Sequence, residues 1–371
     1  MDKVLFILHR TPPVHGAAKV GDYIFNNKNI NKLFKCKFIT IQSSSSISEI
    51  GLVNFKKMYS FLKLFINVLF SILIHRPDKI YFTPSIGGVA FFRDFLLSIL
   101  WRIFGLFWHI DVYYHYHTKG IDKYIHKAKI NKLLTSFFLR NVNLIILSPI
   151  LKKDFDKVHS FKKLYFLSNS TEDPFENGDF EKYIYQKKFD KINVLYLSNM
   201  MKEKGYFHVL KLASECKDES VVFHFAGSWM NNKDKHDYYS FIKENRLERK
   251  VIFHGFVDGD AKDKLFKMCH VFVFPTRYPN EAFPLSIIES FSYGLPVLST
   301  NEGAIENMIH DDVGRVIYQM QELSPRLNDI KYTMLNETSS RLCRNHYLNN
   351  FTMDLFEKGL INILTNKNKS S

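Results

Sequence analysis

Two glutamates in the second half of the chain stand eight residues apart in a segment that predicts a strand, a loop and a helix. In Phe272–Val297 the strand ends at Pro275, Glu281 lies in the loop, and a helix that begins near Pro284 contains Glu289. Proline is tolerated in the first turn of a helix. Carboxylates at this spacing can reach two parts of one extended ligand. The first N–H groups of the helix lie at the positive end of its dipole, which stabilises a phosphate.

This segment resembles the signature of glycosyltransferase family 4, a group of retaining, nucleotide-sugar-dependent enzymes with the two-Rossmann GT-B fold. The matching residues are Pro275-Thr276, Glu281-Ala282-Phe283-Pro284-Leu285, Glu289 and Gly294-Leu295-Pro296-Val297. The resemblance implies that Glu281 contacts the donor sugar and that Glu289 binds the ribose hydroxyls of the nucleotide. It also implies that the backbone of Phe283, Pro284 and Leu285 lies near the diphosphate or the sugar.

A second match follows the predicted strand Val194–Leu197. Glu203-Lys204-Gly205 is intact, and Lys204 matches the family's diphosphate-binding lysine. A lysine in this place stabilises the negative charge that develops on a leaving diphosphate. The family usually has Gly-Arg where this chain has Ser198-Asn199, so Asn199 takes the place of a cation. Three other cations could substitute for it, namely Lys202, Arg277 and Arg10.

Two further matches lie in the first half of the chain. Gly16 follows a predicted strand in His9–Ala18 and opens a helix, and a small residue there lets the backbone approach a ligand closely. In the family this loop borders the donor phosphates and the acceptor. His117 ends the predicted strand Asp111–Tyr116 and matches a histidine that faces the donor sugar in relatives. His115 lies on the same side of the strand and is the alternative.

Two smaller matches complete the predicted site. Gly255, in His254-Gly255-Phe256-Val257, resembles the family's turn near the nucleotide base, and Asn169 resembles the Asn of its Asn-Gly linker. No DxD-type metal motif stands after a strand in the expected cleft, and the four cysteines stand far apart. We therefore expect no metal and no cofactor beyond the donor substrate. The predicted catalytic residues are His117, Lys204 and Glu281, and the predicted donor-binding residues are Gly16, Asn199, Gly255, Phe283, Pro284, Leu285 and Glu289.

Short apolar runs alternate with helix-length stretches along the whole chain, which is typical of parallel α/β sheets. The predicted strands are Val4–Leu8, Phe38–Ile41, Lys79–Phe82, Asp111–Tyr116, Leu144–Leu147, Lys163–Leu167, Val194–Leu197, Val221–Ala226, Val251–Phe253, Val271–Phe274 and Pro296–Ser299. The alternation occurs twice, and the turn-rich segment Ser168–Asp179 between the two series is predicted to be the linker between two domains. We expect two Rossmann-like doubly wound domains of a GT-B fold, at residues 1–168 and 169–345. One last helix, from Tyr347 to about Leu364, falls in a tail at 346–371.

The net charge of +14 is unevenly distributed. Residues 1–170 hold 25 Lys and Arg against 9 Asp and Glu, whereas the remaining residues are close to neutral. This asymmetry indicates an anionic partner of the first half. The cations are scattered among long apolar stretches and are not grouped with stacking aromatics, so we expect no nucleic acid.

Two apolar stretches, Tyr59–Ile74 and Val89–Ile110, each carry polar residues in steps of three and four. This spacing predicts amphipathic helices with wide apolar faces rather than spanning helices. Their apolar faces can pack on a sheet, or part of them can dip into an anionic membrane surface. Both alternatives remain open for the stretch from Lys56 to Arg102.

The combined features predict a retaining glycosyltransferase that moves a sugar from a nucleotide sugar to a polyprenyl-diphosphate-linked glycan. We expect it in bacterial O-antigen or capsule synthesis, as a cytoplasmic protein held at the inner face of the plasma membrane. The apolar run Val4–Leu8 is too short for a signal peptide. The alternatives are a sugar-nucleotide 2-epimerase, a nucleic-acid-binding protein and a non-catalytic scaffold that keeps the fold.

Overall fold

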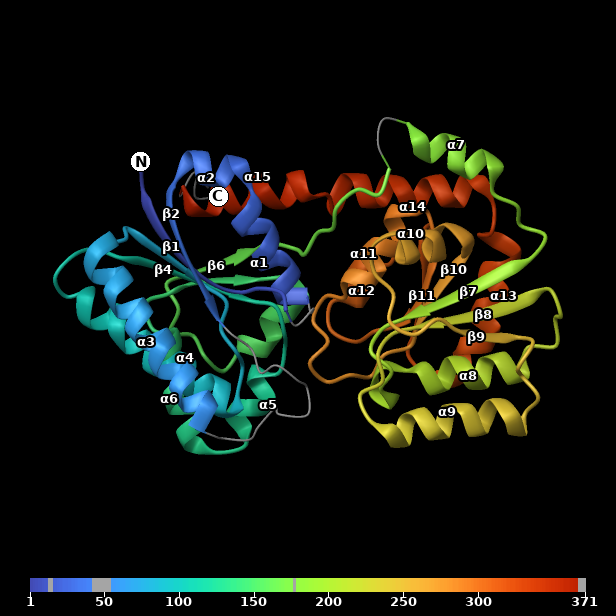
Figure 1. Ribbon diagram of the computed structural model, residues 1–371, viewed down its shortest axis with the longest axis horizontal. Helices are drawn as coiled ribbons and strands as arrows, with labels where there is room; N and C mark the ends of the chain where they lie inside the picture. Colours follow the sequence, from blue (N-terminus) through green and yellow to red (C-terminus); the bar gives the residue numbers. More distant parts are fainter. Residues whose placement is uncertain (13–15, 42–54, 176–177, 366–371) are drawn as a thin grey trace. The chain divides into compact units, whose positions relative to one another are not determined.

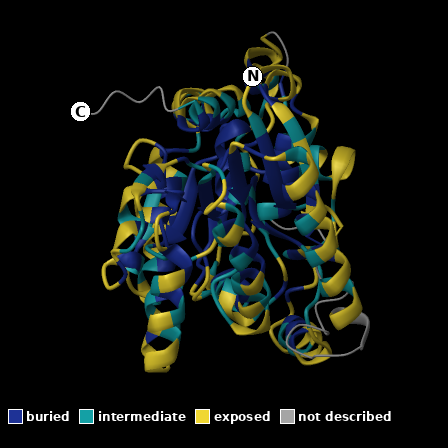
Figure 2. Cartoon of the chain, turned by 90° about the vertical axis from the view of Figure 1, so that its left-hand side faces the viewer, coloured by how far each residue is buried: buried dark blue, intermediate teal, exposed yellow. Residues whose placement is uncertain are grey.

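Apolar runs of three to seven residues form two separate parallel sheets in the computed structural model (Figure 1). The structure describes residues 1–12, 16–41, 55–175 and 178–365, and side chains at 55–57 are excluded. By contacts, the chain divides into two compact units. Unit 1 consists of Met1–Asn169 with Phe356–Ser371, and unit 2 of Ser170–Leu355. Strands in both sheets are mostly buried because parallel sheets are covered on both faces, as Figure 2 shows.

The sheet of unit 1 has the order β2-β1-β3-β4-β5-β6, and every neighbouring pair is parallel. Its strands are β1 (Lys3–His9), β2 (Lys35–Ile41), β3 (Lys79–Phe82), β4 (Asp111–Tyr116), β5 (Asn143–Ile146) and β6 (Lys163–Phe166). Its helices are α1 (Gly16–Asn26), α2 (Lys28–Leu33), α3 (Phe55–His75), α4 (Gly88–Phe104), α5 (Ile121–His126), α6 (Lys129–Leu139) and most of α15 (Met353–Leu364).

The chain crosses this sheet in two directions, which distributes the helices over both faces. From β1 it moves to β2 at one edge and then returns past β1 to β3. Because parallel crossovers are right-handed, α1 and α2 cover one face, while α3, α4 and α6 cover the other. On the first face, Phe6 and Leu8 of β1 pack with Ile24 of α1 and with Phe356 and Leu360 of α15.

The sheet of unit 2 has the order β12-β11-β10-β7-β8-β9, again all parallel. Its strands are β7 (Ile192–Leu197), β8 (Val221–Ala226), β9 (Val251–Phe253), β10 (Val271–Phe274), β11 (Val297–Thr300) and β12 (Gly314–Ile317). Its helices are α7 (Asp179–Gln186), α8 (Tyr206–Glu215), α9 (Asn232–Glu244), α10 (Gly259–Met268), α11 (Leu285–Ser292), α12 (Ile305–Met308), α13 (Leu323–Thr333) and α14 (Glu337–Asn350).

All eleven predicted strands are present. Their ends lie within two residues of the predicted ends, except the start of β2, which lies three residues earlier. Two other elements differ from the prediction. Strand β12 was not predicted, because it is a short edge strand with a half-buried Arg315 in its middle and gives no apolar run. The single last helix predicted from Tyr347 is wrong. Helices α14 and α15 are separate there, since the chain leaves the helix at Phe351, and the Thr352 hydroxyl accepts a hydrogen bond from the Leu355 N–H, 3.4 Å away.

The two long apolar stretches form α3 and α4, and α4 has apolar side chains on both its buried and its exposed sides. Its polar residues Asp94 and Ser98 are fully buried together with Phe91, Leu97 and Trp101, whereas Phe92 and Leu96 are exposed. Among the described helices, α3 is long and apolar enough over Met58–His75 to cross a membrane, by length and composition alone. Its Leu64 and Val68 are buried in unit 1.

Candidate active site

Lys204 follows β7 and Glu281 follows β10, the two neighbouring strands between which the strand order of the unit 2 sheet reverses. The chain runs from β7 outward to β8 and β9, and then returns to the other side of β7 as β10. Ligands of open parallel sheets bind beyond the carboxyl ends of the strands at such a switch point. Lys204 lies in the loop after β7 and Glu281 in the loop after β10. The topology therefore brings together two predicted residues that stand 77 positions apart.

These two side chains form an ion pair that is largely shielded from solvent. Lys204 Nζ lies 2.5 Å from Glu281 Oε2, and the side chains are 16% and 11% exposed. The ammonium group also lies 4.5 Å from the centre of the Tyr278 ring, within the range of a cation–π interaction. A cation and a carboxylate this close together can bind two parts of one polar ligand. The cation binds an anionic group, and the carboxylate accepts hydrogen bonds from hydroxyl groups.

The loop that carries Lys204 packs directly on the loop after β10. The Glu203 carbonyl accepts hydrogen bonds from the Arg277 N–H (2.7 Å) and the Thr276 hydroxyl (3.4 Å). Gly205 has a φ of +92°, and a Cβ there would stand 2.4 Å from the Pro275 carbonyl oxygen. Only glycine fits this close approach. The Glu-Lys-Gly triplet is thus the structural unit that places the Lys204 ammonium group.

A second close contact supports Glu281 from the neighbouring strand. Gly303, after β11, has a φ of +63°, and a Cβ there would lie 2.2 Å from the Glu281 carbonyl oxygen. The adjacent Ala304 N–H donates to the Ala282 carbonyl at 2.8 Å. Sequence analysis missed this support, although a glycine just beyond a strand end was an available signal.

Helix α11 begins where the sequence predicted, with Pro284 in the N-cap position and Leu285 as its first residue. Phe283 and Pro284 are buried and Leu285 is half-buried. The first N–H groups of a helix have no acceptor within the helix, and they carry the positive end of its dipole. This N-terminus follows the Glu281 loop directly, so a phosphate near Lys204 would find a second source of positive potential.

Glu289 does not stand alone on α11, because Lys262 of α10 pairs with it. Lys262 Nζ lies 2.5 Å from Glu289 Oε1, and both side chains are 15% exposed. The two helices also meet through Tyr293, which stacks on Phe266 at 4.8 Å and donates a hydrogen bond to Asp263 at 2.9 Å. Sequence analysis missed Lys262, since nothing in its local pattern distinguishes it from a solvated lysine.

Asn199 and Gly255 lie at the carboxyl ends of β7 and β9, on the same edge of the sheet as Lys204. Asn199 is exposed, and Gly255 has open space around it. The three cations proposed to replace the missing arginine all have other partners. Lys202 pairs with Asp237 at 2.6 Å, the Arg277 guanidinium donates to Asn301 and the Tyr318 carbonyl, and Arg10 of unit 1 pairs with Asp22.

The two histidines of β4 have different surroundings, which distinguishes them as candidates. His115 is fully buried, and its Nδ1 lies 2.6 Å from the Tyr81 hydroxyl. Burial, and then the neighbouring His117, hold the pKa of His115 well below its usual range. His117 is half-buried just past the strand end, its ring 4.1 Å from that of His115. Its Nδ1 lies 3.1 Å from Asn169 Oδ1.

Gly16 is the first residue of α1, as predicted. The rest of its loop is only partly described, since Pro13, Val14 and His15 lie outside the described residues. Unit 1 therefore contributes Gly16, His117 and Asn169 to the predicted set, and unit 2 contributes the others.

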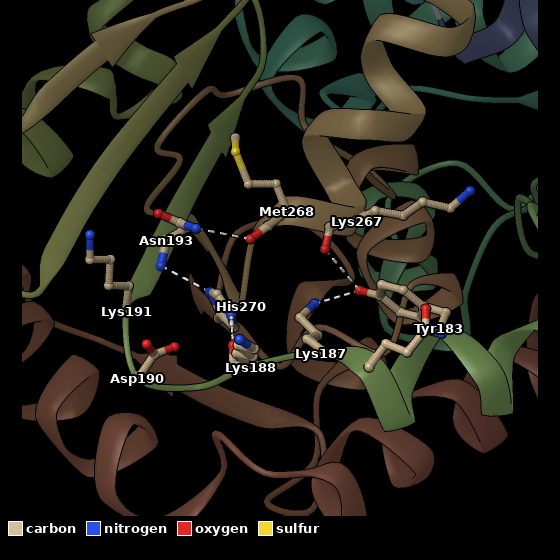
Figure 3. A pocket seen from close by; sticks show the side chains of 10 residues that line it. Tyr183, Lys187, Lys188, Asp190, Lys191, Asn193, Lys267, Met268 and His270 are labelled. Carbon is tan, nitrogen blue, oxygen red and sulfur yellow. Dashed lines mark hydrogen bonds between the residues drawn. The ribbon is translucent and has the colours of Figure 1, made fainter.

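A cavity of about 470 Å³ lies at the opposite end of the unit 2 sheet and contains none of the predicted residues (Figure 3). It is lined by Tyr183, Gln186, Lys187, Lys188, Asp190, Lys191, Asn193, Lys267, Met268 and His270. Lys187 donates to the Tyr183 hydroxyl and to the Cys269 carbonyl, and burial lowers its pKa to about 7. The cavity borders the amino ends of β7 and β10, whereas ligands of open parallel sheets bind beyond the carboxyl ends of the strands. It is therefore not the expected ligand site.

Within residues 1–12, 16–41, 55–175 and 178–365, no group of three or more His, Cys, Asp or Glu is placed to hold a metal ion.

Comparisons with known proteins concentrate on unit 2. Residues 179–340 match the family model described as glycosyl transferases group 1. An uncharacterized 41.2 kDa protein in the cps region of Klebsiella pneumoniae is 27% identical over 134 residues, 36% of this chain and 34% of that protein. The O-antigen biosynthesis glycosyltransferase WclY of Escherichia coli is 29% identical over 121 residues, 32% of each chain. The alignments thus span about a third of the length of these relatives.

The fold comparison extends over the whole chain. The crystal structure of HepE from Anabaena in complex with UDP superposes with a TM-score of 0.72, at 16% identity, covering 98% of this chain and all of that one. The expected GT-B fold, with two Rossmann-like units, is confirmed. The chain as a whole thus has the GT-B fold, and residues 179–340 within it match the glycosyl transferases group 1 model.

Proposed function

We propose that this chain transfers a sugar from a nucleotide-diphosphate sugar to a lipid-linked glycan acceptor during synthesis of a bacterial surface polysaccharide such as O-antigen or capsule. We further propose that it retains the anomeric configuration, as its resemblance to family 4 implies. Unit 2 would bind the donor and unit 1 the acceptor. The observation that carries the proposal is the Lys204–Glu281 pair at the switch point, followed directly by the N-terminus of α11.

The chemistry follows from where these charges lie. When the bond between the anomeric carbon and the diphosphate breaks, negative charge develops on the diphosphate. The Lys204 ammonium group and the α11 N-terminus stabilise that charge, which lowers the barrier. Glu281 accepts hydrogen bonds from sugar hydroxyls, and Glu289 accepts them from the ribose. We propose that no metal is needed, so that turnover persists in the presence of a chelator.

The acceptor is proposed from the charge of unit 1 and from the names of the relatives. The first half of the chain has an excess of sixteen positive charges, which suits an acceptor that carries phosphate and a surface that carries anionic lipid. The WclY relative is named for O-antigen biosynthesis. We propose a peripheral protein on the cytoplasmic face of the plasma membrane. The relatives' names favour neither a 2-epimerase nor a non-catalytic scaffold.

The donor proposal is tested by a thermal-shift panel of UDP-, GDP-, dTDP- and CMP-sugars on wild type and Glu289→Ala. A ligand that binds only the folded state raises the melting temperature by mass action. We expect one nucleotide class to stabilise wild type and to lose most of that effect in Glu289→Ala. Glu306→Ala is the matched control, because Glu306 is an exposed helical glutamate of the same unit. If no nucleotide stabilises wild type, with or without a detergent-solubilised polyprenyl-diphosphate sugar, the proposal fails.

A further inference from the structure

Three neighbouring helices on one face of the unit 1 sheet expose many apolar side chains. Helix α3 lies beside α4, and α4 lies beside α6 (Figure 1). Each of the following side chains is at least 40% exposed: Met58, Tyr59, Leu62, Ile66, Phe70, Leu73 and Ile74 on α3, Val89, Phe92, Leu96, Ile103, Leu106 and Phe107 on or just after α4, and Ile130, Leu133 and Phe137 on α6. We call this surface the α3–α4–α6 face. Apolar patches of this extent are rare on proteins that are surrounded by water alone.

Helix α4 is apolar on its outer side as well as on its buried side, which also contains Phe91, Leu97 and Trp101. Its Asp94 and Ser98 have no exposed surface, whereas Phe92 and Leu96 are 48% and 44% exposed. The buried carboxylate is satisfied inside the fold, because it accepts a hydrogen bond from the Ser85 N–H at 2.7 Å and pairs with Arg93. A surface helix in water normally places its polar stripe outward. The apolar outer side of α4 therefore indicates apolar surroundings there.

The charges on this surface all have one sign. Helices α3 and α6 contain no Asp or Glu, and the single acid of α4 is the buried Asp94. Exposed lysines stand among the apolar side chains, with Lys63 on α3 and Lys129 and Lys132 on α6. Lysines around an apolar helix face are typical of surfaces that bind anionic lipid.

We propose that the α3–α4–α6 face is a membrane-docking surface that lies on an anionic bilayer. The exposed apolar side chains reach the boundary of the acyl chains, and the lysines contact lipid phosphates. Because Leu64, Val68 and Ile72 of α3 are buried in the core of unit 1, this helix lies on the membrane and does not cross it. A second copy of the chain is a poorer occupant, since two such faces would bring lysines of like charge together.

This inference rests on the part of the proposed function that places the acceptor in a membrane, but its test does not depend on turnover. Purified wild type is sedimented with vesicles of phosphatidylcholine alone and with vesicles that also contain phosphatidylglycerol. We expect binding to the mixed vesicles, weakened by added salt. In Ile66→Gln/Leu96→Gln, loss of two inserted side chains should lower the partition coefficient by more than about tenfold.

Two matched control variants in unit 2 test whether lost vesicle binding is specific to the α3–α4–α6 face or follows from any loss of exposed leucines or lysines. Leu342→Gln/Leu348→Gln replaces helical leucines of unit 2 with 42% and 40% exposure, close to the 40% and 44% of Ile66 and Leu96. It should bind vesicles as wild type does. Lys129→Glu/Lys132→Glu should abolish the preference for phosphatidylglycerol, whereas Lys235→Glu/Lys243→Glu on α9 should not. Equal melting temperatures of all variants establish that they are folded.

Three results would overturn the inference. If wild type fails to bind mixed vesicles, or if Ile66→Gln/Leu96→Gln binds them as wild type does, the face does not dock on a membrane. A dimer in analytical ultracentrifugation that the same double substitution dissociates assigns the face to a second copy of the chain. The donor thermal shift is measured on the same samples. If vesicle binding is absent but the nucleotide still raises the melting temperature, the proposed donor site is retained and the docking surface is rejected. If vesicles bind but no nucleotide raises the melting temperature, the docking surface is retained and the donor site is rejected.

Discussion

Lys204 Nζ and Glu281 Oε2 lie 2.5 Å apart at the switch point of the unit 2 sheet, so the two charges assigned to the donor neutralise each other. A donor diphosphate that attracts the lysine competes with the carboxylate for it. The carboxylate then becomes available to sugar hydroxyls. We therefore propose that the pair couples phosphate binding to sugar binding, because a ligand group that binds only one of its members leaves the other charge shielded and uncompensated.

The first prediction concerns the stability of this pair. Lys204→Met leaves the Glu281 carboxylate in a shielded site without its cation. Removing one partner of a buried pair costs several kcal/mol, and we expect a loss of about 3 kcal/mol in the free energy of unfolding, measured by urea denaturation. The double variant Lys204→Met/Glu281→Gln should regain most of that loss, while turnover stays abolished. A double variant that is as unstable as the sum of the single variants would show that the two groups do not interact.

The second prediction concerns Lys262, which we infer to be a positioning residue for Glu289. Lys262→Met should weaken binding of the nucleoside diphosphate identified by the thermal-shift panel about tenfold in titration calorimetry, because the carboxylate loses the partner that orients it. Lys262→Arg should restore most of the affinity. The loss should be smaller for the 2′-deoxy form of that nucleotide, since it lacks a ribose hydroxyl. An equal loss for both nucleotides would indicate that Lys262 acts on the phosphates or the base instead.

The third prediction concerns Asn169, which holds the His117 ring in unit 1. Its amide oxygen lies 3.1 Å from His117 Nδ1, so Nδ1 carries the proton and Nε2 acts as an acceptor in the neutral ring. Asn169→Leu should lower kcat at least about tenfold, as losses of ring-orienting partners do. Affinity for the nucleoside diphosphate identified by the thermal-shift panel should not change, because Gly255 and Glu289, proposed to lie near the base and the ribose, belong to unit 2. A large change in affinity for that nucleotide would assign Asn169 a different role.

Sequence reasoning predicted the strands, because these depend on local pattern, and it placed Lys204 and Glu281 in one site, where the structure pairs them. Buried parallel strands appear as short apolar runs, and β12 was missed since Arg315 interrupts its run. Lys262 could not be predicted, because its pairing with Glu289 depends on how α10 packs against α11. Periodicity placed Asp94 in a polar stripe of α4. It could not determine which side of the helix faces the sheet, and that side decides the character of the α3–α4–α6 face.

The last prediction concerns acid stability and two buried histidines of unit 2. His270 Nδ1 accepts a hydrogen bond from the Asn193 N–H at 3.0 Å, and its Nε2 donates to the Lys188 carbonyl at 2.7 Å, as Figure 3 shows. This arrangement requires a neutral ring. Burial, and then the nearby Lys187, lower the pKa of His270 to about 4. For His224, burial followed by the charges of His254 and His270 lowers the pKa to about 4 as well.

Both shifts make stability depend on pH in one direction. In the unfolded chain these histidines take up protons near pH 6.5, whereas in the folded chain they remain neutral down to about pH 4. The free energy of unfolding must therefore fall as the pH falls through this window, by on the order of 2–3 kcal/mol for each histidine. Urea denaturation at several pH values should show this slope. His270→Gln should flatten it, whereas His236→Gln, which changes an exposed histidine of α9, should not. If His270→Gln retains the full slope, the acid sensitivity arises from other groups.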